Sequence, residues 1–193
     1  ERHQVATPGR LATVLMVEPE SVDIAALPAV LRGASGPVED ADGLARVLAA
    51  RESICAAAGA FDADPAGFDR LFFGADLAPR RLDARIAEVV ARLGTDPAHP
   101  HTAQQWAAGA GLSYSRFLHL FARECGTSYR AFRAWKRARS LLHHVTREAS
   151  LTDVALDIGY PDATHFSHSI RRIYGLKPRD IFAGSRRLAV LRP

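Results

Sequence analysis

The feature that most constrains the fold is a sequence unit that occurs twice in the second half of the chain. Residues of similar type recur at an offset of 48 and then of 49 positions, in the pairs Ala107 and Ala155, Gly111 and Gly159, Phe121 and Ile170, Gly126 and Gly175, and Arg130 and Arg179. Each copy reads as a short helix, a glycine-containing turn, a longer helix and a glycine stop. Two helices joined by a tight turn with glycine are typical of a helix-turn-helix motif.

Capping residues predict where these helices begin. Thr102 with Gln105 fits a capping box, and Ser150 with Asp153 repeats that pattern. Side chains that can cap a helix N-terminus also stand at Ser113, Ser128 and Asp162. The predicted elements are a first motif at about 102–126, a connecting helix at about 129–145, and a second motif at about 150–175. At about 1.5 Å per residue the connecting helix would be roughly 25 Å long.

Apolar residues occupy one face of the second helix in each unit. In the first unit these apolar residues are Phe117, Leu120 and Phe121. Their spacing is helical, and we expect them to pack against Trp106, Ala107 and Leu112. In the second unit they are Phe166, Ile170 and Ile173, which we expect to pack against Val154, Ala155, Ile158 and Tyr160. The opposite faces carry polar and small residues. Because the second helix of such a motif enters the DNA major groove, we expect these faces to be exposed.

The first 80 residues give weaker signals. Residues 11–18 read as a strand without an obvious partner, residues 21–33 read as a short helix that Gly33 ends, and residues 44–60 and 82–93 read as helices. A lone strand cannot satisfy its own backbone, so we expect that the front of a larger protein is missing; a tag scar or a natural processed start is the alternative. The predicted fold class is mainly α: two helix-turn-helix subdomains joined by a long connecting helix, preceded by a helical segment with a short β-strand remnant.

Charge is unevenly distributed along the chain. Residues 1–99 carry 10 Lys and Arg against 15 Asp and Glu, a net charge of −5, whereas residues 100–193 carry 15 against 6, a net charge of +9. A basic half indicates a polyanionic partner; a solvated basic face is the alternative. Uninterrupted apolar runs are too short for a membrane span, so no membrane is expected. Cys55 and Cys125 form no metal or redox motif, and so few cysteines fit a reducing cytoplasm.

Residues 102–184 resemble the DNA-binding domain of the AraC/XylS family of bacterial transcription regulators. The positions that carry the resemblance are Ala155, the Gly159-Tyr160 turn, the run from His165 to Ser167, the Tyr174-Gly175 stop, and Pro178. The resemblance implies an AraC-type domain over residues 81–186, a tail at 187–193, and a remnant of an N-terminal effector or dimerisation region over 1–80. It implies double-stranded DNA as the partner. The further partners that it implies are RNA polymerase, a second copy of the chain in a homodimer formed through the N-terminal region, and a small-molecule effector of the full-length protein. It places the protein in the bacterial cytoplasm, at the nucleoid, with no cofactor and no enzymatic activity.

The resemblance also assigns roles to residues. The base-reading positions map to Ser115, Leu118, His119, Ala163, Thr164, His165, Ser167 and His168. Cations, hydroxyls and helix starts that suit phosphate contacts are Thr102, Tyr114, Arg116, Ser128, Ser150, Arg171, Arg172 and Lys177. Leu118 and Ala163 depart from polar relatives, because they can contact only a thymine methyl group.

Three alternatives stay open at the level of sequence. His165 and His168 have the spacing of two metal ligands on one helix, but no third ligand lies nearby, which disfavours a metal site. His165 also fits a partly buried packing residue. In place of a transcription regulator, the chain fits a DNA-repair or methyl-acceptor enzyme that carries this module, or a helical protein-interaction module.

Overall fold

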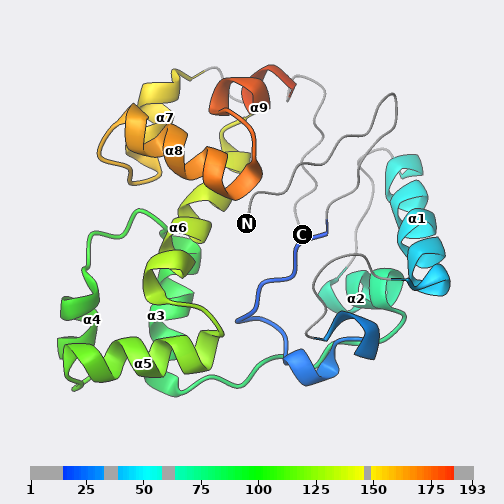
Figure 1. The fold of residues 1–193 in the computed structure, drawn as a ribbon, viewed down its shortest axis with the longest axis horizontal. Coiled ribbons are helices and arrows are strands. Elements are labelled where there is room, and N and C mark those ends of the chain that lie inside the picture. The colour runs from blue at the N-terminus through cyan, green and yellow to red at the C-terminus, as the bar shows by residue number, and fades with distance from the viewer. Residues whose placement is uncertain (1–14, 33–38, 58–63, 146–148, 185–193) are drawn as a thin grey trace. The chain divides into compact units, whose positions relative to one another are not determined.

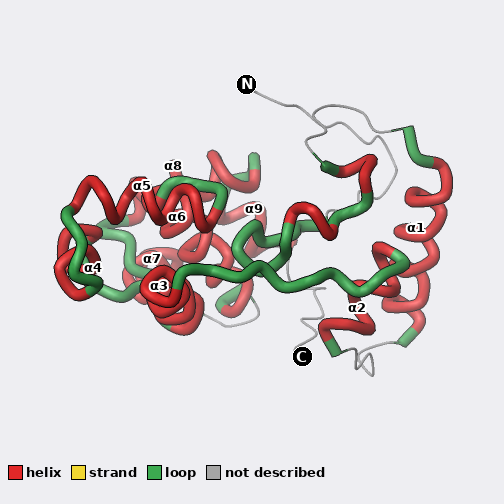
Figure 2. The backbone as a smooth tube through the Cα atoms, turned by 90° about the horizontal axis from the view of Figure 1, so that it is seen from below, coloured by secondary structure: helices red, strands yellow, loops and turns green. Residues whose placement is uncertain are grey.

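The computed structural model describes residues 15–32, 39–57, 64–145 and 149–184. These residues form helices joined by loops, and the one β-type pairing among them is an isolated antiparallel bridge between Val22 and Pro79 (Figures 1 and 2). The mainly helical fold predicted from the sequence is therefore confirmed. The chain divides into two compact units, residues 1–79 and residues 80–192. No helix in the described ranges is both long and apolar enough to cross a membrane.

The first unit contains helices α1 (Ala41–Ala56) and α2 (Pro65–Phe73). They pack around a small apolar cluster that includes Ala50, Phe72 and Leu77. Arg46 fastens the two helices together, because its Nη1 donates a hydrogen bond to the carbonyl oxygen of Phe73 at 2.9 Å.

Two expectations for this unit change. The helix expected after residue 20 is two separate 3₁₀ turns, Ile24–Ala26 and Ala29–Leu31. Pro28 stands between them, and its missing N–H and ring prevent one continuous helix. The strand remnant is not confirmed: residues 11–14 lie outside the described residues, and residues 15–18 form no strand.

The second unit holds seven α-helices in its described residues: α3 (Ala84–Thr95), α4 (Ala103–Gly109), α5 (Tyr114–Cys125), α6 (Tyr129–Ser140), α7 (Leu151–Asp157), α8 (Ala163–Tyr174) and α9 (Pro178–Gly184). Within this unit α6 lies between the α4–α5 pair and the α7–α8 pair (Figure 1). The two pairs are the two helix-turn-helix motifs.

The sequence repeat is also a repeat of backbone geometry. In the first turn the N–H of Leu112 donates to the carbonyl of Ala107 at 2.8 Å, and in the second the N–H of Tyr160 donates to that of Ala155 at 2.8 Å. Both turns pass through a glycine with positive φ, 65° in the first copy and 86° in the second. The same local sequence pattern therefore builds the same turn twice, 48 residues apart.

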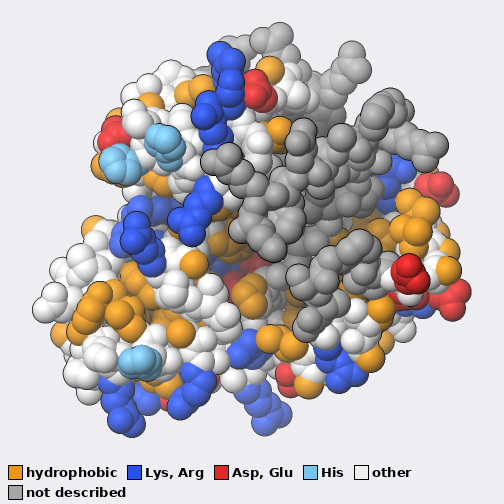
Figure 3. Space-filling view, in the orientation of Figure 1, with side chains coloured by type: hydrophobic (Ala, Val, Ile, Leu, Met, Phe, Trp, Pro, Cys, Tyr) orange, Lys and Arg blue, Asp and Glu red, His pale blue; other side chains and the backbone are white. Residues whose placement is uncertain are grey.

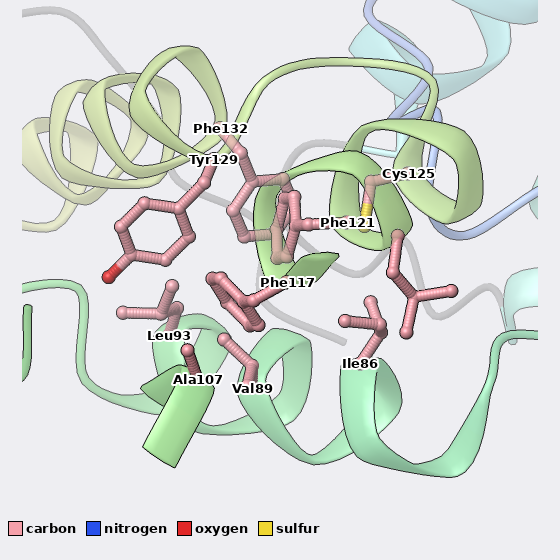
Figure 4. Close-up of a cluster of buried hydrophobic side chains, with 10 residues drawn as sticks. Ile86, Val89, Leu93, Ala107, Phe117, Phe121, Cys125, Tyr129 and Phe132 are labelled. Carbon is pink, nitrogen blue, oxygen red and sulfur yellow. The ribbon is translucent and has the colours of Figure 1, made fainter. Parts of the chain in front are cut away.

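Each motif has its own apolar core. In the first, side chains from α3, α5 and α6 point toward one another (Figure 4). Phe121 is fully buried there and meets Tyr129 edge to face, with ring centroids 5.4 Å apart. Such edge-to-face pairs are preferred because the ring edge is positive and the ring face negative. In the second motif, Phe166 and Ile170 are buried against α7 and against Leu141, which follows α6. The apolar faces predicted from the sequence are the buried ones.

The connecting helix is shorter than predicted. Helix α6 ends at Ser140 rather than near residue 145, and the chain continues as a 3₁₀ turn over Leu141–His143. The hydroxyl of Ser140 donates to the carbonyl of Arg137 at 2.8 Å, which competes with the helical backbone pattern and tightens this end. Twelve residues at about 1.5 Å each give a helix of roughly 18 Å.

One face of α6 holds the loop between α3 and α4. The hydroxyl of Tyr129 donates to the carbonyl of His101 at 3.3 Å, and Nη2 of Arg133 donates to that of His99 at 2.5 Å. One turn further, Nε of Arg137 donates to the carbonyl of Pro97 at 3.2 Å. The three donors are four residues apart on the helix, and the three acceptors are two residues apart in the loop. We call this set the α6 ladder.

Gly159, in the turn of the second motif, lies against the same loop. A Cβ at this position would come within 2.9 Å of the Cα of Ala98 and 3.1 Å of Nε of Arg137. At Gly111, the equivalent position of the first motif, a Cβ would meet nothing within 4 Å. The two copies of the turn are alike in backbone but differ in their surroundings, because only the second packs against the loop from Pro97 to His101.

We predict that Gly159→Ala lowers the free energy of unfolding by about 2–4 kcal/mol, because it combines backbone strain at positive φ with overlap against Ala98. The matched control Gly111→Ala carries only the strain, about 1–2 kcal/mol. Urea unfolding followed by circular dichroism measures both variants. Equal losses in the two would contradict the close approach at Gly159.

Candidate nucleic-acid interface

Side-chain caps fix where the second helix of each motif begins. Ser113 Oγ accepts a hydrogen bond from the N–H of Arg116 at 3.3 Å at the start of α5. At the start of α8, Asp162 Oδ1 accepts from the N–H groups of Thr164 and His165, both at 2.8 Å. Each cap satisfies backbone donors that have no partner inside the helix. The first turn of each helix, which carries several of the predicted contact residues, therefore has a defined position.

Most of the predicted base-reading residues are exposed. Those with exposed side chains are Ser115, His119, Thr164, His165 and His168. Ala163 and Ser167 are half-buried, and Leu118 is half-buried and packs against the core of the first motif. The side chain of Leu118 therefore lies partly in that core and partly at the surface.

A groove of about 810 Å³ runs along α6 between the two motifs. Its lining includes five predicted contact residues: Tyr114, Ser128, His165, His168 and Arg172. It also includes three arginines of α6 that the sequence analysis did not select: Arg130, Arg133 and Arg137. We call this surface the α6 groove. It brings together side chains from the second helix of both motifs.

The α6 groove is strongly basic, and the residues that the structure describes in its lining include no Asp or Glu. Lys and Arg side chains gather between the two motifs, and His side chains are exposed on both (Figure 3). Burial and then the neighbouring Arg133 lower the pKa of Arg137, since both disfavour a further positive charge. A groove of clustered cations without counter-charges favours an anionic ligand.

A second, smaller cavity lies along α5. It brings three predicted residues, Ser115, Arg116 and His119, together with Arg85 of α3 and Arg123. We call it the α5 cavity. Its described lining contains no carboxylate, but Arg85 and Arg123 are paired with the nearby carboxylates of Asp83 and Glu124, at 2.8 and 3.1 Å. The basic charge of the second unit is therefore concentrated beside the exposed faces of α5 and α8.

The other predicted contact residues line neither surface: Thr102, Leu118, Ser150, Ala163, Thr164, Ser167, Arg171 and Lys177. The hydroxyls of Thr102 and Ser150 are engaged in capping, with the N–H of Gln105 donating to Thr102 Oγ1 at 3.3 Å and the N–H of Asp153 to Ser150 Oγ at 3.1 Å. These helix starts can still offer their free backbone N–H groups to a phosphate.

The arginines of α6 had a signal in the sequence that was not used. Arg130, Arg133 and Arg137 are spaced by three and four residues, which places them on one face of a helix. Arg85 and Arg123 had no such signal, because α3 and α5 are brought together only by the tertiary fold.

Asp162 makes a further contact with a predicted base-reading residue. Its Oδ2 lies 2.7 Å from Nδ1 of His165, whose side chain is 71% exposed. The interpretation of His165 as a packing residue is therefore wrong. Hydrogen bonds from the backbone and ring of His165 lower the pKa of Asp162. Among the residues that the structure describes, no three His, Cys, Asp or Glu side chains cluster as a metal site would require.

Comparison with known proteins relates these motifs to a family. A family described as "Helix-turn-helix domain" matches residues 106–184. The chain is similar to the invasion protein InvF of Salmonella typhimurium, 35% identical over 72 residues, which are 37% of this chain and 33% of that protein. It is also similar to the HTH-type transcriptional activator RhaS of Escherichia coli O157:H7, 48% identical over 48 residues, which are 25% of this chain and 16% of that protein. The chain spans about a third or less of the length of these relatives.

Solved structures share the fold of the second unit. The DNA-binding domain of AdpA, a global transcriptional factor solved in complex with a target DNA, aligns with a TM-score of 0.51 at 23% identity, over 54% of this chain and 95% of that one. The C-terminal domain of AraT, a response regulator from Geobacillus stearothermophilus, aligns with a TM-score of 0.51 at 16% identity, over 58% and 94%. At these identities the likeness establishes the fold.

The paired motifs around α6, the basic surfaces beside α5 and α8, and the family match define a double helix-turn-helix domain of the DNA-binding class. Residues 106–184 therefore carry a helix-turn-helix domain that is similar to the DNA-binding domains of AraC/XylS-type regulators. The resemblance read from residues 102–184 is thereby confirmed.

The depressed pKa of Asp162 predicts a pH-dependent contribution to stability. Because its pKa is lower in the folded than in the unfolded chain, its stabilisation is fully present above the ordinary carboxyl pKa, about 4, and is lost as pH falls through the lowered value. The difference in unfolding free energy between the wild type and Asp162→Ala should therefore shrink from pH 6 to pH 3.

Urea unfolding at a series of pH values measures that difference. Ser113→Ala, which removes the uncharged cap of α5, is the matched control, and its effect should stay constant over the same range. A constant effect for Asp162→Ala as well would contradict the assignment.

Proposed function

We propose that the chain is a sequence-specific regulator of transcription that binds double-stranded DNA, with α5 and α8 inserted into adjacent segments of the major groove. The observation that carries the proposal is the placement of two capped helices with exposed polar faces on opposite ends of α6, beside surfaces lined by several arginines. In a helix-turn-helix motif the second helix reads bases while the first braces it.

Base reading in this proposal uses the exposed faces of the two helices. On α5 the readers are Ser115, His119 and the outer part of Leu118. On α8 they are Ala163, Thr164, His165, Ser167 and His168. Histidine, Thr and Ser can hydrogen-bond base edges, whereas Leu118 and Ala163 offer apolar contact to a thymine methyl group.

Phosphate contacts would come from the basic surfaces. The predicted cations are Arg116, Arg171, Arg172 and Lys177, and the α6 groove adds Arg130, Arg133 and Arg137. Tyr114, Ser128, and the helix starts at Thr102 and Ser150 complete the set. Arg130 and Arg172 are exposed, whereas Arg133 and Arg137 already hold the loop before α4. We therefore assign the free phosphate contacts in the groove to Arg130 and Arg172, because the α6 ladder engages the other two.

The wider assignments rest on the family alone. We propose that the protein acts in the bacterial cytoplasm, at the nucleoid, without enzymatic activity or a cofactor. RNA polymerase is its proposed protein partner. Residues 1–80 would be the remnant of a region that binds a small-molecule effector and forms a homodimer, followed by an AraC-type domain to residue 186 and a tail. Relatives such as RhaS, an HTH-type transcriptional activator, favour activation over repression.

Two other functions would leave different traces. A DNA-repair enzyme of the methyl-acceptor kind needs a reactive cysteine. Of the two cysteines, Cys125 is buried and Cys55 is exposed on α1, and no group of metal ligands is found in the described residues. A protein-interaction module would bind duplex DNA weakly and without sequence preference.

Salt dependence separates these functions. Affinity for duplex DNA should fall steeply between about 50 and about 200 mM salt, because phosphate contacts release counterions. Arg130→Ala should weaken binding to specific and random duplexes alike and reduce the slope of log affinity against log salt by about 1. Thr164→Ala with His168→Ala should weaken specific binding more than random binding. Fluorescence anisotropy on both duplexes measures these effects.

Arg92→Ala is the matched control for charge. Arg92 is exposed on α3 and lines neither the α6 groove nor the α5 cavity, so its loss should leave the salt slope unchanged. Affinity that stays flat as salt rises would refute DNA binding as the function.

A further inference from the structure

The two reading helices differ in what caps them. Ser113 caps α5 with a single hydroxyl, and the residue three positions later is Arg116. Asp162 caps α8 with one carboxylate oxygen and uses the other to bond the ring of His165, three positions later. The carboxylate therefore acts at once on the backbone of α8 and on one of its exposed side chains.

The bond from Asp162 decides which ring nitrogen of His165 carries the proton. An ionised carboxylate only accepts hydrogen bonds, so Nδ1, 2.7 Å from Oδ2, must be the donor. In a neutral imidazole the other nitrogen is then an acceptor, because one nitrogen holds the single proton. Nε2 lies on the opposite side of the ring from Asp162, on a side chain that is 71% exposed.

We propose that Asp162 is a specificity-determining positioning residue, which orients His165 and makes its Nε2 a hydrogen-bond acceptor toward DNA. The inference rests on the proposed function, since it assumes that α8 enters a major groove. There an acceptor selects bases that present an amino group, adenine through N6 or cytosine through N4. Guanine and thymine present acceptors at the corresponding edge and are disfavoured.

The rest of the α6 groove sharpens this assignment. The arginine and histidine side chains that line it with His165 are His168 and Arg172 of α8 and Arg130, Arg133 and Arg137 of α6, and Tyr114, Tyr129 and Tyr160 line it as well. The arginines are donors only. Neutral His165 thus adds an imidazole acceptor beside cations that can only donate, and a base with an exposed amino group needs such an acceptor.

Asp162→Asn tests the inference because it should exchange the donor and acceptor nitrogens of the His165 ring. Asparagine caps helices as well as aspartate, so its Oδ1 can keep the two backbone hydrogen bonds at the start of α8. Its amide nitrogen would replace Oδ2 and donate to Nδ1, which moves the ring proton to Nε2. His165 would then present a donor to DNA, and the preferred base should change to guanine or thymine.

The experiment has two arms, both at pH 8, above the range in which histidines ordinarily titrate. In the first, ring ¹⁵N chemical shifts of the free protein should show the proton on Nδ1 of His165 in the wild type and on Nε2 in Asp162→Asn. In the second, selection from a randomised duplex library should show a change of about tenfold in base preference at one position of the second half-site.

Two controls isolate the role of Asp162. Asp153→Asn removes the same charge from the cap of the neighbouring helix α7 and should leave base preference unchanged. In a His165→Ala background, Asp162→Asn should no longer alter the preference, because the side chain through which it acts is absent.

Each outcome bears on the inference. A wild-type proton on Nε2 overturns it without any DNA, and this measurement holds even if Asp162→Asn does not fold. Unchanged base preference in a folded Asp162→Asn protein that still binds DNA overturns it and leaves the proposed function intact. A wild-type protein that binds no duplex at all overturns both.

Discussion

The geometry of the second unit depends on the α6 ladder. Tyr129, Arg133 and Arg137 donate from one face of α6 to three carbonyls of the loop between α3 and α4. Four helical residues rise about 6 Å, which two residues of chain can span. The ladder therefore ties the loop to the helix at regular intervals. Because Gly159 packs against the same loop, the ladder positions both motifs on α6.

The α6 ladder also explains why the two copies of the repeated unit have different surroundings. Both turns have the same backbone hydrogen bonds, yet only the second has a neighbour at its glycine. The arginines of α6 also differ in what they contact. Arg133 and Arg137 are committed to loop carbonyls, whereas Arg130 stays exposed in the α6 groove. A single helix thus carries two arginines that hold the loop and one that stays exposed in the groove.

The sequence predicted the parts of this unit that depend on local pattern. Helix starts follow from capping residues such as Thr102 and Asp162, and the buried faces follow from the spacing of Phe117 and Phe166. The end of α6 was misplaced because the bond from Ser140 to Arg137 depends on a rotamer. The α6 groove could not be foreseen as a surface, because its walls come from three separate segments, within 103–114, 128–137 and 160–173, that only the tertiary fold brings together.

In the proposed complex, one chain presents two reading helices to adjacent major-groove segments. Methylation interference at guanine N7 on a selected site tests it most directly, since that atom lies in the major groove. We expect two clusters of interference about 10 base pairs apart on one face of the duplex, with the cluster nearer α8 lost in a Thr164→Ala, His168→Ala variant. A single cluster in the wild type, or clusters on opposite faces, would contradict it.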